Sequence, residues 1–327
     1  GNLSDVVAAD SSMDVAQELV SGMDVDDDEG PSMDLGADEL FHGILDVEEE
    51  ETAFDVPADE STPDTLEEIV NPFCQGNGDG LIDATEIPAQ HSLGVVVGFT
   101  TNKSGTTVTV PDLAGSVNPD GGGYLWDFSA IDPASDETVY ESLLPVSSFW
   151  FADRFEEGQF VQPFDKQHLG IYRLDDDGYR LVGLASYQED WTALKYETPI
   201  RLMVFPMGLG DSWEDFEVEA SGLFEGETYP QDYGMAGELS VHHTFSVQVD
   251  RKGTLAAPMG NFEVLRLYMD VTMAVSNSMM AVPVLSQRSK IVLFVAECVG
   301  MVVRVKSKAD ETAIEFDEAV EYKRLGF

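Results

Sequence analysis

Two stretches of the sequence, residues 241–249 and residues 265–276, alternate with a period of two. Every second position is apolar, apart from His243, and the positions between are mostly polar. Because successive side chains of a strand point to opposite faces, this pattern predicts strands with one face on a core and one in water. No segment longer than two turns has helical periodicity, so we expect an all-β protein.

Shorter segments with the composition of strands follow along the chain. They are residues 93–99, 170–174, 179–187, 200–205, 291–296, 301–307 and, less clearly, 313–323. Turn sequences such as Asp177-Gly178 and Val299-Gly300 separate them. Strands joined by short turns, without crossover helices, form antiparallel sheets. We therefore expect residues 91–327 to form a curved antiparallel sheet, either a half-barrel or a sandwich.

The N-terminal part differs in composition. Residues 1–70 contain 23 acidic residues and no Lys or Arg. Self-repulsion and sparse apolar residues prevent the burial that would offset chain entropy. We expect residues 1–70 to be a disordered acidic tether. Met-Asp-Val or Met-Asp-Leu recurs at residues 13, 23 and 33. The alternative interpretation is that these three repeats are short motifs that dock onto a partner.

The charge balance limits the partners of the chain. Asp and Glu number 62 against 17 Lys and Arg, a formal net charge of −45. Nucleic acids and anionic membrane surfaces both require a basic face. We therefore expect no nucleic-acid partner, and membrane attachment only through a lipid anchor upstream of this sequence.

Residues 75–86 have the spacing of the twelve-position calcium loop of EF-hands. The expected ligands, at positions 1, 3, 5, 7, 9 and 12, are Gln75, Asn77, Asp79, Leu81 (through its carbonyl), Asp83 and Glu86. Gly80 occupies position 6, where the turn requires a positive φ. Calcium prefers such a set of oxygen ligands, so residues 71–90 are expected to hold it. Gln75 departs from the usual Asp, which predicts reduced affinity, and the alternative is a linker turn without metal.

Catalytic motifs are absent from the sequence. It has no H-E-x-x-H, G-x-S-x-G, P-loop or C-x-x-C. His242 and His243 are adjacent, and in a strand they would face opposite ways and could not chelate together. We expect His243 to be a core residue with satisfied hydrogen bonds. The chain is accordingly expected not to be an enzyme.

Cys74 and Cys298 are the two cysteines of the chain. In an oxidising compartment unpaired thiols are a liability, which favours a disulfide. A buried free cysteine that behaves as a small hydrophobe is the alternative.

Two groups of residues carry a family resemblance. Residues 74–80 with 86–88 resemble the C-x-G-N-x-D-G … E-x-P opening of predicted lipoproteins of myxobacteria and their relatives. The second group is residues 199–206, 210–213, 257–262 and 299–302. It resembles secreted bacterial β-sheet lipoproteins, some of which are compared in fold with the LolA/LolB-type lipoprotein carriers.

The sequence starts at Gly1 without an initiator Met, so we expect an export signal to have been removed. The resemblance implies lipid attachment just upstream, and hence an exported, lipid-anchored protein of the periplasm or the outer-membrane surface. The first functional hypothesis is a non-enzymatic lipoprotein that binds a lipid or another hydrophobic small molecule on the concave face of its sheet. The second is a structural or adhesive module stabilised by calcium. The third is a hydrolase of an envelope polymer. A large apolar cavity would favour the first hypothesis and a filled interior the second.

Overall fold

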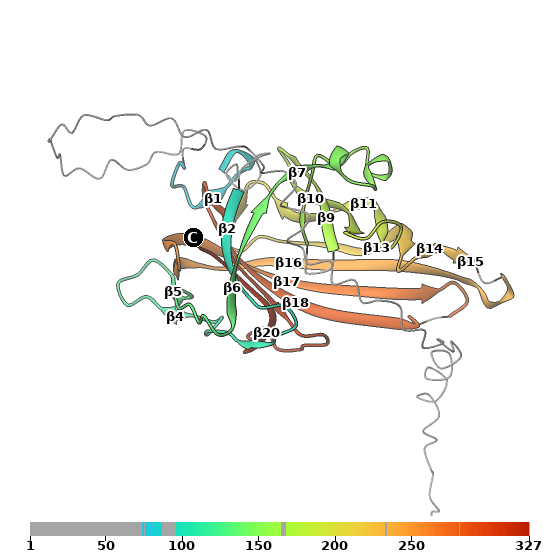
Figure 1. The fold of residues 1–327 in the computed structure, drawn as a ribbon. Helices are drawn as coiled ribbons and strands as arrows, with labels where there is room; N and C mark the ends of the chain where they lie inside the picture. Colours follow the sequence, from blue (N-terminus) through green and yellow to red (C-terminus); the bar gives the residue numbers. More distant parts are fainter. Residues whose placement is uncertain are drawn as a thin grey trace, which may run out of the picture. The chain divides into compact units, whose positions relative to one another are not determined.

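The two alternating stretches form the longest strands of the domain, β16 (Glu238–Ala257) and β17 (Gly260–Asn277). They pair along their whole length as a hairpin, and β18 (Leu285–Ala296) lies beside β17 (Figure 1). The computed structural model describes residues 74, 76–86, 96–164, 168–232, 234–280 and 282–326, which belong to one compact unit, Leu66–Phe327. The expected tether, residues 1–70, and Gln75 lie outside the described residues.

Short and medium strands complete the domain. They are β1 (Leu81–Ile82), β2 (Val96–Asn102), β3 (Val108–Thr109), β4 (Ser116–Val117), β5 (Tyr124–Asp127), β6 (Asp136–Ser142), β7 (Leu144–Pro145), β8 (Phe160–Pro163), β9 (His168–Asp175), β10 (Gly178–Ser186), β11 (Ala193–Val204), β12 (Met207–Gly208), β13 (Ser212–Phe224), β14 (Glu227–Tyr229), β15 (Gln231–Asp232), β19 (Gly300–Ser307) and β20 (Glu318–Leu325). The described residues also contain four 3₁₀ turns: η1 (Ala84–Glu86), η2 (Val146–Ser148), η3 (Ala152–Arg154) and η4 (Gly234–Ala236). Among the described residues, no helical segment has the length and apolar character needed to cross a bilayer.

The main sheet closes into a barrel. Antiparallel pairing runs from β8 through β9, β10, β11, β13, β16, β17, β18, β19 and β20 to β2, and from β2 to β6. The chain then turns at the buried Leu143 into β7, which pairs with β8 and completes the ring. The expected all-β class and curved antiparallel sheet are confirmed, and the sheet curves further than a half-barrel.

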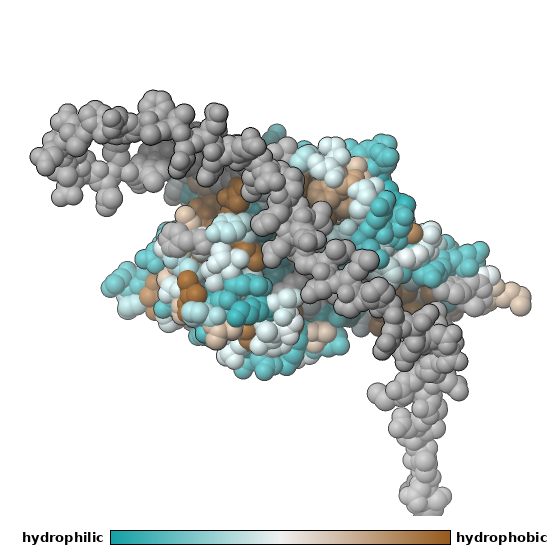
Figure 2. Space-filling view, viewed as in Figure 1, coloured by the Kyte–Doolittle hydropathy of each residue, from teal (hydrophilic) through white to brown (hydrophobic). Residues whose placement is uncertain are grey.

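The largest apolar cluster among the described residues is built mainly from β8 to β11, β13 and β16 to β18. Phe160, Tyr172, Leu194, Phe245 and Leu267 are among its buried members. The described face in Figure 2 is mainly hydrophilic, with apolar residues in small separate groups. The alternation therefore turns the apolar side chains of the long strands inward, as predicted.

The outer face of β17 differs from the prediction, because part of it is not in water. Tyr268 packs on a second apolar cluster, built from the outer faces of β18 to β20 and the covering segments around Trp126 and Phe316. Arg266, expected to face solvent, is fully buried there. It reaches the carboxylates of Asp250 and Glu315, which satisfy its charge.

Candidate functional site

The expected calcium loop begins with two side-chain turns. The Asp79 N–H donates to Asn77 Oδ1 at 2.8 Å, and the Leu81 N–H donates to Asp79 Oδ1 at 2.8 Å. Such Asn and Asp contacts stabilise tight turns without any metal. Gly80 has a φ of +82°, as expected for position 6 of the loop. Leu81 and Ile82 then form β1, which pairs with β12 and attaches the loop to the domain.

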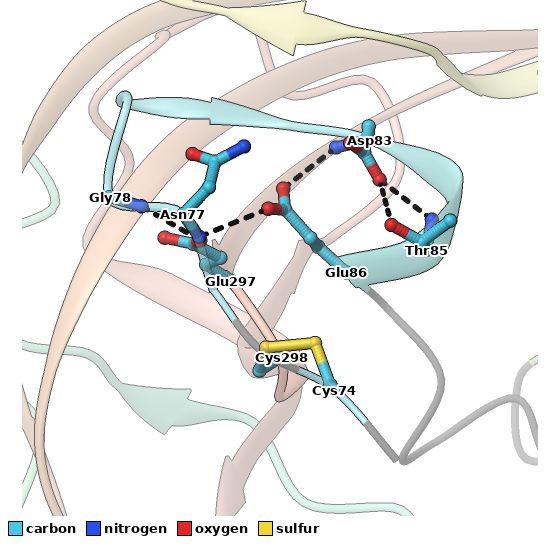
Figure 3. The surroundings of a disulfide bond; sticks show 8 residues. All are labelled: Cys74, Asn77, Gly78, Asp83, Thr85, Glu86, Glu297 and Cys298. Carbon is cyan, nitrogen blue, oxygen red and sulfur yellow. Dashed lines mark hydrogen bonds between the residues drawn. A yellow bond between two sulfur atoms is a disulfide. The ribbon is translucent and has the colours of Figure 1, made fainter.

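The Glu86 side chain folds back into this loop (Figure 3). Its carboxylate accepts backbone hydrogen bonds from Asn77 (3.4 Å) and Asp83 (3.1 Å), and the residue is only 3% exposed. Burial raises the pKa of this carboxyl, and the negative charges of Asp83 and Glu297 raise it further, whereas the two backbone bonds lower it. No ion pair from Lys or Arg to Glu86 is found in the described part of the chain.

The fit of the loop to calcium is incomplete. The Asp83 carboxylate bonds to the N–H and hydroxyl of Thr85, and Asn77 and Asp79 are engaged in their turns. Across the described residues, no group of three or more His, Cys, Asp or Glu side chains is arranged to hold a metal ion. Glu86 has the inward orientation that position 12 requires, while the other carboxylates would have to turn toward an ion.

Glu297 joins the loop from a distant part of the chain. Its carboxylate accepts a hydrogen bond from the Gly78 N–H at 3.1 Å (Figure 3). It stands next to Cys298, which forms a disulfide with Cys74, with the two Cα atoms 5.5 Å apart. The disulfide alternative is therefore the one present in the structure. Glu297 was missed because its proximity to the loop depends on this long-range pairing.

A second candidate site lies inside the barrel. It is a cavity of about 500 Å³, and its lining residues come mainly from β9 to β11, β13 and β16 to β20. Its apolar wall consists of Phe164, Leu184, Leu194, Phe224, Phe245, Val271, Met273, Ile291, Ala309 and Val320. Polar side chains on the remaining wall include Gln287, Ser289 and Lys306. This volume lies within the range of small-molecule sites, which are mostly apolar with a few polar groups.

His243 reaches this cavity from β16. It pairs with Met273 of β17, which in turn pairs with Gln287 of β18, so the three cavity-lining residues form one row across the sheet. His243 is 5% exposed, and its Nδ1 has no hydrogen-bond partner among the described residues. The prediction of a core position is confirmed, but the prediction of a satisfied histidine is wrong. His242 faces the other way and contacts Ser240 Oγ through Nε2 at 2.7 Å.

A smaller cavity of about 80 Å³ adjoins the first, since Phe164, Phe245 and Ile291 line both. Its wall includes charged side chains, among them Lys323 and Glu141, which are paired at 2.5 Å. Arg304 also lines it and lies 3.3 Å from Glu321. These buried charges are of both signs, so they compensate one another.

Comparisons of the chain with known proteins gave no match, whether to profiles of protein families, to curated proteins or to solved structures. The resemblance to secreted lipoproteins therefore stays a prediction.

Proposed function

We propose that the β domain binds an apolar small molecule inside its barrel and acts as a binding protein rather than an enzyme. The observation that carries this proposal is the cavity of about 500 Å³, whose wall is mainly apolar. Protein interiors are otherwise close-packed, and an unfilled volume sacrifices contacts on all its sides. A ligand that fills the cavity restores these contacts, which gives the open interior a function.

The proposal includes export and lipid anchoring at the envelope. The disulfide between Cys74 and Cys298 supports export, because such bonds persist in oxidising compartments such as the bacterial periplasm. An acidic chain, with a formal charge of −45, would be repelled by anionic headgroups. A covalent lipid upstream of the sequence would hold it at the membrane in spite of this repulsion.

The second candidate function is calcium binding at the loop, as a brace between the loop and the barrel. The observation that favours it is the buried Glu86 carboxylate, near Asp83 and Glu297 and without a basic partner in the described residues. If Asp83 and Asp79 turn inward, Asn77, Asp79, Asp83, Glu86 and the Leu81 carbonyl would supply oxygen ligands. Bound calcium would offset the repulsion among these carboxylates.

Binding of 1,6-diphenyl-1,3,5-hexatriene tests the ligand proposal, because this hydrocarbon dye fluoresces in apolar surroundings. We expect wild-type protein to bind it with saturation. Met273→Trp, which fills the cavity, should weaken binding at least about tenfold through lost space. Met259→Trp is the matched control, because Met259 lies exposed at the turn between β16 and β17. Equal affinities of wild type and folded Met273→Trp would contradict the proposal.

A further inference from the structure

We propose that the ligand carries a neutral hydrogen-bonding group, such as a hydroxyl, and that His243 binds this group inside the barrel. This inference rests on the proposed function, since it concerns the ligand of the same cavity. It identifies the ligand class as a long apolar molecule with an uncharged polar group, for example a fatty alcohol, rather than a fatty acid anion or a pure hydrocarbon.

The first observation is the unsatisfied histidine. His243 lines the cavity and is 5% exposed, and within the described part of the chain nothing forms a hydrogen bond with its Nδ1. Its ring contacts are aromatic, with Tyr196 at 5.4 Å and Phe245 at 6.3 Å between ring centroids. The large majority of buried polar side-chain atoms have a partner, because an unpaired one forfeits its hydration. Nδ1 itself is buried, so a ligand group in the cavity would meet the imidazole at the edge of the ring that lines the cavity.

The second observation is a neighbouring group in the same condition. The ring of Tyr196 packs edge-on against His243, at an interplanar angle of 88°. This tyrosine is 1% exposed, and its hydroxyl also lacks a hydrogen-bond partner in the residues that the structure describes. Tyr196 lies beside the cavity wall rather than on it, so the two unpaired groups mark a part of the wall, at His243, that lacks hydrogen-bond partners among the described residues. Apolar residues at both positions would fill the same space without this cost.

The surroundings favour an uncharged group. Burial lowers the pKa of His243 to about 4, and the nearby His242 and His168 lower it further, so the imidazole is neutral at pH 7. A neutral imidazole can donate and accept one hydrogen bond each, but it cannot compensate an anion. Glu225 and Lys306, which also line the cavity, have opposite charges. An ionised ligand group at His243 would lose its hydration, and the neutral imidazole would supply no counter-charge.

Competition against bound diphenylhexatriene tests the inference in the full chain, with 1-decanol and decanoate as probes at pH 8. We expect His243→Phe to weaken 1-decanol about three- to tenfold, the effect of one neutral hydrogen bond. Its affinities for the dye and for decanoate should stay within about twofold of wild type. His243→Gln keeps a neutral donor and acceptor and should recover part of the 1-decanol affinity. His242→Phe, on the opposite face, is the matched control and should leave all three affinities unchanged.

Other outcomes would overturn the inference in distinguishable ways. If His243→Phe leaves 1-decanol unchanged, weakens decanoate instead or weakens the dye equally, then His243 does not select a neutral group. If 1-decanol does not compete in wild type, the ligand class is wrong while dye binding keeps the proposed function intact. If the dye itself does not bind, or binds Met273→Trp as well as wild type, the proposed function fails and the inference fails with it.

Discussion

The backbone N–H of Cys298 donates a hydrogen bond to the carbonyl oxygen of Glu86, 2.5 Å away. The side chain of Cys298 is at the same time bonded to Cys74. These two links fix both ends of the described part of the loop to the turn between β18 and β19. Cys298 has a φ of +62°, which is unfavourable for a residue with a Cβ and is maintained by the two links.

The disulfide gives the first prediction. Thiol titration of the denatured, unreduced protein should find no free thiol. Replacing both residues, in Cys74→Ser/Cys298→Ser, should lower the free energy of unfolding by about 2 to 5 kcal/mol, because the bridge closes a long segment of the unfolded chain. Chemical denaturation of both proteins measures the difference. Two free thiols per wild-type chain would contradict this pairing.

The loop gives the second prediction, which concerns Glu86→Gln. Because burial raises the pKa of Glu86, the ionised carboxylate costs stability as pH rises through that pKa, and this cost is absent at lower pH. Without calcium at pH 7.5, Glu86→Gln should therefore be at least as stable as wild type. With calcium, only wild type should gain thermal stability, because a charged, bidentate ligand is lost in the variant.

Calorimetry of Gln75→Asp provides the companion measurement. The change adds a negative charge at the first position of the loop and should tighten calcium binding relative to wild type. Identical calorimetric traces for wild type, Gln75→Asp and Glu86→Gln would mean that the loop is a turn without a metal.

The buried Arg266 gives the third prediction. Its guanidinium donates to the Leu113 carbonyl at 2.5 Å and contacts Glu315 at 3.0 Å, which holds two covering segments on the outer face of the barrel. Arg266→Met should lower the free energy of unfolding by about 2 to 3 kcal/mol, since its acidic partners can partly regain water. Arg288→Met is the matched control at an exposed pair with Asp270 and should cost less than about 1 kcal/mol. If chemical denaturation gave equal decreases in the free energy of unfolding for the two variants, the buried ion pairs of Arg266 would contribute no more than an exposed pair.

His243 gives the fourth prediction, on pH. Its pKa falls from 6.5 to about 4 on folding, so the unfolded chain binds more protons between these values. The free energy of unfolding therefore has its full value above pH 6.5, where His243 is neutral in both states. It decreases by up to about 3 kcal/mol as pH falls toward 4. His243→Phe lacks this loss, so the difference between the two free energies of unfolding should change between pH 7.5 and 4.5. A constant difference would contradict the buried, neutral histidine.

The sequence predicts the long hairpin well because β16 and β17 alternate almost without interruption. It misses β13, whose register shifts between Asp215 and Val218 and so breaks the period of two. Glu217, at a φ of +48°, lies in this irregular part of the strand. The closure through β6 and β7 is likewise hidden, because it depends on a bend at Leu143 and on pairing with distant strands.

The candidate sites were predictable to different degrees. The turns at Asn77 and Asp79 and the inward Glu86 follow from local spacing, whereas Glu297 reaches the loop only through the long-range fold. The cavity could not be located from sequence. It forms where apolar side chains from opposite strands are too short to contact one another, and this depends on the three-dimensional arrangement of the strands. Likewise, only three-dimensional packing leaves the Nδ1 atom of His243 without a hydrogen-bond partner in the described domain.

A density map of the intact protein prepared with 1-decanol tests the central claim most directly. The account predicts continuous elongated density in the cavity, in contact with Leu184 and Met273, with one end at hydrogen-bond distance from His243. A cavity closed by rearranged side chains, or one that contains only separate water molecules, would contradict a ligand-binding barrel.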